Sequence, residues 1–193
     1  MDNGKYRVGQ TVLDIHDALL GKMAALRVLH ALLHHEWAGR SWRMEETEDG
    51  YFNGYSTLKA LRQNVGPRGA NDASIFLRGV PVLLDLGIFD NLELVERNRA
   101  LRWDFSIDFA FAMEAETQDN WALLDVAEVR RCRTAEQLRL YCNARRVHAM
   151  LAPQFRLVIP ERPADESAGA HWKRYWRPLQ RAVEVVADLL EVE

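Results

Sequence analysis

The sequence predicts a mainly α-helical protein with small β-hairpins, and three stretches of it carry that prediction. Residues 8–37 repeat apolar side chains at helical spacing. Residues 56–111 combine helical and strand-like patterns, separated by turn-forming residues. Residues 172–190 repeat apolar side chains every three or four positions, which is typical of one helix face. With 193 residues, 48% of them apolar, the chain can bury a core and suits one large domain or two small ones.

The N-terminal stretch is predicted to form two helices. Its apolar stripe consists of Val12, Ile15, Leu19, Leu26, Leu29, Leu33 and Trp37. Gly21 interrupts this stripe, so we expect a short helix before it and a longer helix after it. The helical spacing is lost over residues 38–55, where Tyr51 and Phe52 are candidates for a short strand.

The following segment is predicted to hold two helices joined by a turn. The first covers Ser56–Val65, with its leading serine as the N-cap, and Gly66–Gly69 supplies the turn. The Asn71–Asp72 pair can cap the second helix. That helix is expected to end near Gly87, because glycine adopts a left-handed backbone at low cost.

Two strand-like runs come next and are predicted to form a hairpin. They are Leu92–Val95 and Ala100–Phe111, and residues 96–99 join them with a basic tip. Helix, turn, helix and then a hairpin is the order in which a winged-helix domain presents one helix to the DNA major groove. We therefore expect a winged-helix-like domain over residues 1–113.

A second, degenerate winged-helix-like domain is expected over residues 121–193, after a polar linker at Glu114–Asn120. Thr134–Gln137 has the pattern of a capping box, which predicts the start of a helix. Phe155–Ile159 is a strand candidate, and a loop is expected over residues 160–170. The chain is too short here for a second complete wing. The predicted fold is thus a pair of tandem winged-helix-like units.

The last helix has the most regular apolar pattern in the chain. Its seam consists of Trp172, Trp176, Leu179, Val183, Val186 and Leu190. We expect this seam to pack against the second domain, and a homodimer contact is the alternative use. Pro178 lies inside the pattern, so a kink or a helix start is expected close to it.

Two segments give the chain a resemblance to a known family. Ala135–Arg146 looks like a helix that carries Leu-Tyr followed by basic residues, and Trp176–Val186 looks like a late helix with aromatic, basic and then apolar-acidic positions. In these features the sequence resembles the plasmid replication initiators that are built from two tandem winged-helix domains. The resemblance covers most of residues 20–190 and implies sequence-specific binding to repeated DNA sites.

Candidate DNA-binding residues occur in both domains. Those of the first domain are the polar side chains of its helices and hairpin: Lys59, Arg62, Arg68, Asn71, Ser74, Arg78, Arg97, Arg99 and Arg102. Arginine and asparagine can bind bases bidentately, whereas lysine and serine suit phosphates. Those of the second domain form a basic stripe on the last helix: Lys173, Arg174, Arg177 and Arg181. This stripe could bind phosphates or an acidic partner protein, and for both sets a solvated polar surface is the alternative.

The distribution of charge bears on the DNA reading. The formal net charge of −3 argues mildly against it, because phosphate neutralisation dominates such affinity. Residues 126–181, however, hold twelve basic and five acidic side chains, a balance of +7. Residues 45–49 hold four acidic side chains, so that loop is expected to lie away from DNA.

Other kinds of site find little support. His30 and His34 stand four positions apart and could share a zinc ion, but no third ligand has a diagnostic spacing and the cysteines are remote in sequence, so no metal or cofactor is expected. Cys132 and Cys142 are ten positions apart in a helical region, which makes a disulfide improbable. No nucleophile or nucleotide-loop motif indicates an enzyme. No membrane span or leader is expected, and the reduced cysteines suggest the cytoplasm.

The sequence therefore predicts a DNA-binding protein that acts in replication initiation or transcription control and reads double-stranded DNA with one helix and a basic wing. The alternative is a protein–protein interaction module, such as a phage or plasmid regulator or inhibitor, which keeps the winged-helix scaffold without binding DNA. The net acidity and the acidic loop favour that alternative.

Overall fold

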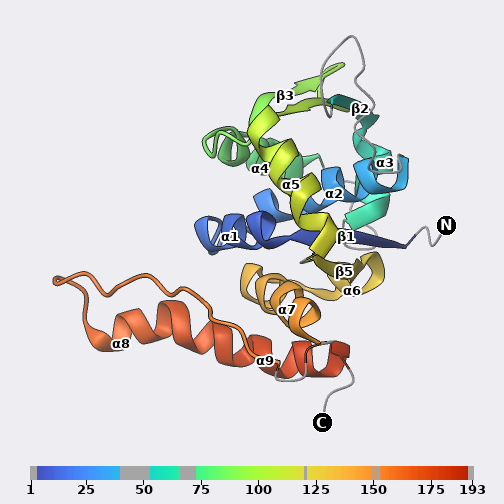
Figure 1. The fold of residues 1–193 in the computed structure, drawn as a ribbon. Helices are drawn as coiled ribbons and strands as arrows, with labels where there is room; N and C mark the ends of the chain where they lie inside the picture. Colours follow the sequence, from blue (N-terminus) through green and yellow to red (C-terminus); the bar gives the residue numbers. More distant parts are fainter. Residues whose placement is uncertain are drawn as a thin grey trace.

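The protein folds into a body of helices and two small antiparallel sheets, from which a long helical segment projects (Figure 1). The computed structural model describes residues 4–39, 53–65, 73–119, 121–148, 150 and 153–190. The first elements are β1 (Lys5–Gly9), α1 (Gln10–Ala18), α2 (Met23–Gly39), β2 (Asn53–Thr57), α3 (Leu58–Val65), α4 (Ser74–Leu84), β3 (Phe89–Val95) and β4 (Ala100–Phe105). They are followed by α5 (Ile107–Asp119), β5 (Trp121–Asp125), α6 (Val126–Arg131), α7 (Ala135–Val147), α8 (Ala168–His171), the π-helical turn η1 (Trp172–Trp176) and α9 (Arg177–Leu190). The coarse prediction of a mainly helical protein with small antiparallel hairpins is confirmed.

Helix α2 lies at the centre of the body. Every residue from 28 to 34 is buried, so this helix has no solvent-facing side over that stretch. Helices α3 and α4 and strand β1 pack against it. The central place of α2 explains its almost continuous apolar sequence, because a helix that is covered all round cannot be amphipathic.

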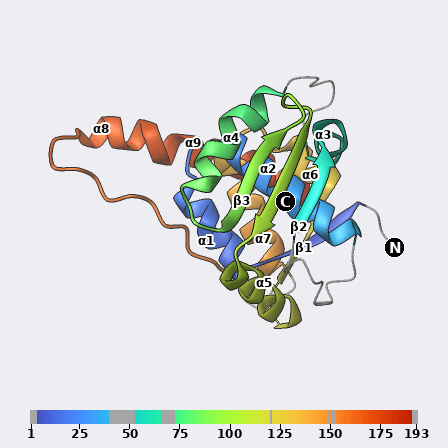
Figure 2. The same ribbon diagram turned by 90° about the horizontal axis from the view of Figure 1, so that it is seen from above.

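The larger sheet lies at one end of the body and has the strand order β2-β4-β3 (Figures 1 and 2). All its pairings are antiparallel, and Leu101 of the middle strand stands opposite Ser56 on one side and Leu94 on the other. Trp103 of β4 is fully buried, and its indole Nε1 donates a hydrogen bond of 2.9 Å to the carboxylate of Glu36 in α2. The sheet is thereby joined to the central helix.

Several local predictions are confirmed. Gly21, with a φ of 72°, separates α1 from α2, and Gly87, with a φ of 67°, follows the end of α4. Thr134 and Gln137 form a capping box at the start of α7. Both cysteines are free and buried.

The boundaries around the first hairpin differ from those predicted. The helix expected at residues 56–65 begins at Leu58, because Ser56 belongs to β2. The hydroxyl of Thr57, and not that of the predicted Ser56, accepts a hydrogen bond from the amide of Ala60. The strand of this region lies at Asn53–Thr57; Tyr51 and Phe52, the Gly66–Gly69 turn and the acidic loop at 45–49 lie outside the described residues.

The predicted extension of the second hairpin strand to residue 111 and the predicted linker at 114–120 are wrong, because residues 107–119 form helix α5. Ile107, Phe109 and Phe111 alternate with smaller residues, as in a strand. The buried members of this segment are instead Phe109, Ala110 and Met113, a helical spacing. The alternation of apolar residues was therefore a misleading signal.

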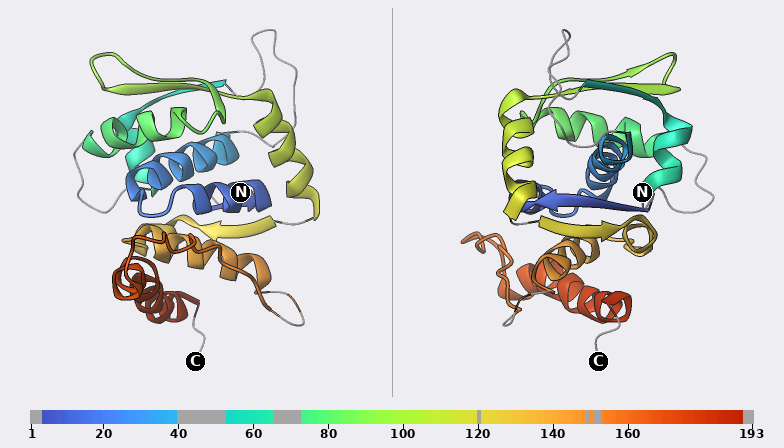
Figure 3. Two further views of the ribbon diagram at one scale, coloured as in Figure 1. Left: turned by 90° about the vertical axis from the view of Figure 1, so that its left-hand side faces the viewer. Right: turned by 45° about the vertical axis from the view of Figure 1, so that its right-hand side comes forward.

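Strand β5 does not open a separate sheet but pairs with β1, which the sequence did not predict (Figure 3). Arg7 stands opposite Leu123 in this antiparallel pair. The carboxylate of Glu116 in α5 accepts hydrogen bonds from the backbone amide of Thr11 at 2.8 Å and from its hydroxyl at 2.7 Å. One hydrophobic cluster accordingly includes residues from both expected domains.

The C-terminal part of the chain departs from the prediction in two ways. Phe155–Ile159 forms no strand; residues 153–163 run in extended, irregular conformation, and the guanidinium of Arg139 donates a hydrogen bond of 2.7 Å to the carbonyl of Val158. The helical segment begins at Ala168 and contains the π-helical turn η1 immediately before Arg177 and Pro178. Proline has no amide hydrogen to donate to the carbonyl four residues earlier, so a widened turn is expected at this place.

Two histidines lie in the centre of the body. His16 in α1 and His30 in α2 are completely buried. Burial lowers the pKa of both imidazoles, that of His30 to about 3, so both rings are neutral in the folded protein at neutral pH.

No helix in the described part of the chain combines the length and the apolar character that a bilayer crossing would require.

Replacing Gly54 by alanine is expected to destabilise the protein by about 1–3 kcal/mol. A Cβ atom at this position would lie 2.2 Å from Cζ2 of Trp103, and the buried indole is tied to Glu36 and cannot retreat. The measurement is the free energy of unfolding in urea.

Gly169→Ala in α8 is the matched control, because no atom lies within 4 Å of the added Cβ. This substitution should leave stability unchanged or raise it by up to about 1 kcal/mol. Equal effects of the two substitutions would contradict the close packing of β2 on Trp103.

Candidate nucleic-acid interface

The tip of the β3–β4 hairpin presents two of the predicted residues, Arg97 and Arg99, to solvent. Glu96, Arg97 and Asn98 have φ values of 53°, 56° and 63°, a left-handed run that reverses the chain between the strands. The amide of Arg99 closes the turn with hydrogen bonds to the carbonyls of Val95 (3.1 Å) and Glu96 (3.3 Å). The side chains of Arg97 and Arg99 are exposed, and neither guanidinium forms a hydrogen bond or ion pair with another described residue. The tip is therefore a well-defined turn with two available guanidinium groups.

Arg102, the third predicted wing residue, is engaged within the sheet. Its guanidinium forms an ion pair of 3.2 Å with Glu93 on the neighbouring strand, and both side chains are about half exposed. A surface pair of this kind contributes little to stability, but it leaves only two of the three predicted hairpin arginines, Arg97 and Arg99, available to a phosphate. The predicted role of Arg102 is thus weakened by its partner.

Helix α4, the predicted groove-reading helix, has an outward face with few polar groups. Arg78 is exposed, and its Nε donates 3.2 Å to the carbonyl of Ser74 one turn earlier. Beside it stand Leu77 and Leu84, which are 48% and 43% exposed, with Pro81 between them. These apolar positions follow one another at i, i+4 and i+7, so they form a stripe that offers no hydrogen bond to a base edge. Arg68 and Asn71 lie outside the described residues.

The two candidates on α3 have different surroundings. Lys59 is exposed, whereas Arg62 is half-buried and its Nε donates 3.1 Å to the carbonyl of Leu58. Lys59 thus remains available to a phosphate, and Arg62 is directed along its own helix.

A hollow beside α4 is lined by cations that sequence reasoning did not bring together. It has a volume of about 540 Å³ and lies between the start of α2, one side of α4 and the link from α6 to α7. Its charged lining residues are Lys22, Arg27, Arg78 and Arg133, and its lining contains no carboxylate. One Nη of Arg27 donates 3.1 Å to the carbonyl of Cys132, which fixes that side chain in place. No sequence signal could have found this set, because its members come from three separate segments.

The helical segment at residues 168–190 projects from the body like an arm, as Figure 1 shows. Only its C-terminal half is anchored, through the buried residues Ala182, Val186 and Leu189. Trp172 and Trp176 of the predicted seam are 44% and 46% exposed, so the expectation that the whole seam packs into the core is wrong. The helical period was correct, but the body covers only the last turns.

The basic stripe of the arm is exposed as predicted. Lys173, Arg177 and Arg181 stand at i, i+4 and i+8, and their side chains have no hydrogen bond or ion pair with another described residue. Arg174 differs, because its guanidinium lies 3.1 Å from the carboxylate of Glu166 at the base of the loop. His171 connects the arm to the preceding irregular segment, residues 153–163, because its Nε2 lies 2.9 Å from the carbonyl oxygen of Pro160.

Other arginines of the basic segment are used within the fold. Arg145 forms an ion pair of 2.9 Å with Glu128, and its Nε donates to the hydroxyl of Tyr141. Burial, followed by the hydrogen bond to Glu128, raises the pKa of Tyr141. This network fastens α6 to α7, so Arg145 does not extend the exposed basic surface.

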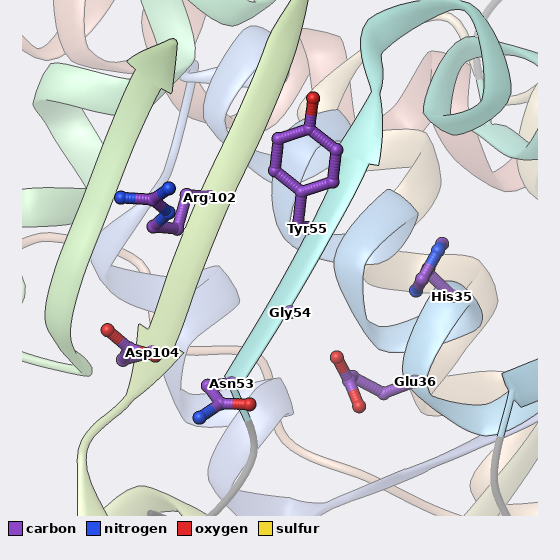
Figure 4. A pocket seen from close by; sticks show the side chains of 7 residues that line it. All are labelled: His35, Glu36, Asn53, Gly54, Tyr55, Arg102 and Asp104. Atoms are coloured by element: carbon purple, nitrogen blue, oxygen red, sulfur yellow. The ribbon is translucent and has the colours of Figure 1, made fainter. Parts of the chain in front are cut away.

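The hairpin tip, α4 and the arm all lie away from α5, with the tip at the sheet end of the body and the arm at the opposite end (Figures 2 and 3). A second hollow of about 530 Å³ on the outside of β2 has a different character (Figure 4). Its lining includes Arg102 together with the carboxylates of Glu36 and Asp104. This mixed lining does not continue the basic surface.

Comparisons of the chain with models of protein families, with curated proteins and with solved structures give no match. The function is therefore inferred from the residues described above.

Leu189→Ala should cost about 2–5 kcal/mol of unfolding free energy, because this side chain is buried where the arm meets the body. Trp176→Ala should change it by no more than about 0.5 kcal/mol, because the indole stands on the projecting half. Urea denaturation followed by circular dichroism measures both. A large loss in Trp176→Ala would mean that the projecting half is packed in solution.

Proposed function

We propose that this protein binds double-stranded DNA through the side that carries the hairpin tip, the hollow beside α4 and the arm. The observation that carries the proposal is the collection of available cations on that side. They come from five separate segments and include Arg97 and Arg99 at the tip, Lys22, Arg78 and Arg133 in the hollow, and Lys173, Arg177 and Arg181 on the arm. Cations arranged in this way can neutralise successive phosphates of one duplex.

The order of elements supports a winged-helix reading of residues 23–105. Helix α2, strand β2, helices α3 and α4 and the β3–β4 hairpin follow one another, and the sheet order is β2-β4-β3. Such an order agrees with a winged helix whose hairpin is the wing. The second unit would then be a degenerate partner that keeps α7 and the arm but has no wing. A role in replication initiation or transcription control follows from this reading and from the resemblance to the tandem winged-helix initiators.

The chemistry of α4 favours backbone contact over base reading. Its outward stripe of Leu77, Pro81 and Leu84 offers no donor or acceptor to a base edge, and Arg78 is directed toward the hollow. We infer that the tip and the arm supply most of the affinity, and that this affinity is strongly dependent on salt.

The same apolar stripe favours a second candidate function. A contiguous exposed apolar patch can mark a contact between proteins, so α4 could dock on a partner protein while the cations remain solvated. Under this alternative the winged-helix scaffold serves as a protein-binding module without DNA.

The arginines of the tip are the first test. The double variant Arg97→Gln, Arg99→Gln is expected to bind a labelled duplex of about three helical turns more weakly than wild type. Its plot of log affinity against log salt should be less steep by about two, because each lost phosphate contact removes about 0.9 from the slope. Fluorescence anisotropy between about 50 and 200 mM salt measures both quantities.

Glu93→Gln, Arg102→Gln is the matched control on the same hairpin. It removes the 3.2 Å ion pair without altering the net charge, and it should keep the wild-type slope. The triple variant Lys173→Gln, Arg177→Gln, Arg181→Gln tests the arm in the same way. Absence of duplex binding by the wild-type protein at the lower salt concentration would exclude the DNA proposal and leave the protein-binding alternative.

A further inference from the structure

Three donor groups that are far apart in the sequence meet in the centre of the body. His16 comes from α1, His30 from α2 and Cys142 from α7, and all three side chains are fully buried. One ligand atom from each residue lies within 4.8 Å of the other two, and this is a cluster with metal-binding composition among the described residues. The zinc pair considered from the sequence, His30 with His34, is thus replaced by a different set, and Cys142 is not remote in space.

The hydrogen bonds around the two histidines direct their ring nitrogens toward each other. The hydroxyl of Tyr6 lies 2.6 Å from Nδ1 of His30, and Nε2 of His30 lies 2.8 Å from Nε2 of His16. Both rings are neutral, so a hydrogen bond between the two Nε2 atoms requires one of them to carry a proton and the other to accept it. Nδ1 of His16 is also buried and has no hydrogen-bond partner. A hydrophobic core gains little from such a group, because an unsatisfied buried polar atom costs stability.

We propose that His16, His30 and Cys142 form a binding site for one soft transition-metal ion, Cu⁺ or Zn²⁺. Two imidazoles and a thiolate are donors that these ions prefer, and two histidines with one cysteine is the donor set of trigonal copper centres. Metal–nitrogen bonds are about 2.0–2.1 Å and metal–sulfur bonds about 2.3 Å, so three donors in a trigonal arrangement around one ion lie about 3.5–3.8 Å apart. The three ligand atoms lie within 4.8 Å of one another, so they need to move by up to about 1 Å to bind one ion.

The surroundings of the cluster suit a bound ion. Tyr6 forms a hydrogen bond with Nδ1 of His30, so the metal would bind Nε2 of His30 in place of the present contact with His16. A hydrogen bond to the nitrogen that does not bind the metal is the usual way to orient a ligand histidine. Binding transfers the thiol proton of Cys142 to solvent, so one proton is released for each ion that binds. Cu⁺ with one thiolate carries no net charge, whereas Zn²⁺ with one thiolate leaves one positive charge. Among the described residues, Arg139 is the cation that, after burial and His30, lowers the pKa of His16, and it forms an ion pair with Asp17.

The position of the site gives it a structural role. Helices α1 and α2 belong to the first half of the chain and α7 to the second, so an ion held by all three would cross-link the two halves. A metal that binds only the folded chain stabilises it by RT ln(1 + [M]/Kd), so the unfolding temperature rises with the concentration of free metal.

The two buried cysteines provide a matched test. Wild-type protein, Cys132→Ser and Cys142→Ser are stripped of metal, checked by circular dichroism for equal folding, and titrated with Zn²⁺ and with Cu⁺ against a chromophoric chelator. We expect one ion per chain in wild type and in Cys132→Ser, and at least a tenfold weaker affinity in Cys142→Ser. Equal binding by both variants, or no stoichiometric binding of either ion by wild type, overturns the proposal.

X-ray absorption of the metal-loaded wild-type protein is a second measurement that does not depend on a variant that folds. One sulfur and two imidazole nitrogens around the ion support the site. A shell of oxygen and nitrogen without sulfur shows that the ion is bound elsewhere and contradicts the assignment.

Discussion

The complete burial of helix α2 is the constraint on which the rest of the fold depends. Because residues 28–34 have no exposed side, other elements must cover this helix from every direction. Helices α3 and α4 and strand β1 do so directly, and the three-stranded sheet is joined to it through Trp103 and Glu36. The hairpin tip and the hollow beside α4 are positioned on this frame, so their cations have fixed places relative to one another.

The pairing of β1 with β5 is the second organising contact, and it joins the two ends of the body. The strands are separated in sequence by more than a hundred residues, yet they are adjacent and antiparallel. Glu116 adds to this junction by holding the first turn of α1 with three hydrogen bonds to Thr11. A closed arrangement of this kind is slow to form but cooperative once formed, because the contact is non-local.

Sequence patterns predicted what depends on neighbouring residues. Gly21, Gly87 and the Thr134 capping box were found because a left-handed backbone or a cap is determined by local chemistry. Helix α5 was missed because its alternating aromatic residues imitate a strand, and β1 was missed because its partner lies far along the chain. The period of the last helix was correct, but periodicity alone does not show how much of a helix the body covers.

Among the candidate sites, too, the sequence predicted the features that depend on neighbouring residues and missed those that depend on the tertiary fold. The tip arginines and the stripe of the arm were predicted, since a hairpin turn and a helix face place nearby residues together. The hollow with Lys22 and Arg133 and the cluster of His16, His30 and Cys142 were not, because their members meet only through the tertiary fold. Ion pairs that the sequence did not predict also reduce the positive charge that two candidates offer to a ligand: Arg102 and Arg174 are exposed, but each has a carboxylate partner.

The arm is attached to the body at one end only, so the packing of three buried side chains determines where its far end lies. A helix rises about 1.5 Å per residue, so the stretch from Ala168 to Arg181 reaches about 20 Å beyond the first anchoring residue, Ala182. A rigid rotation of about 10° at that anchor displaces the far end by about 3.5 Å, which is close to the rise of one base pair. Under the proposed DNA binding, the packing of Val186 and Leu189 against the body would set the register in which Lys173 and Arg177 meet a regularly spaced row of phosphates.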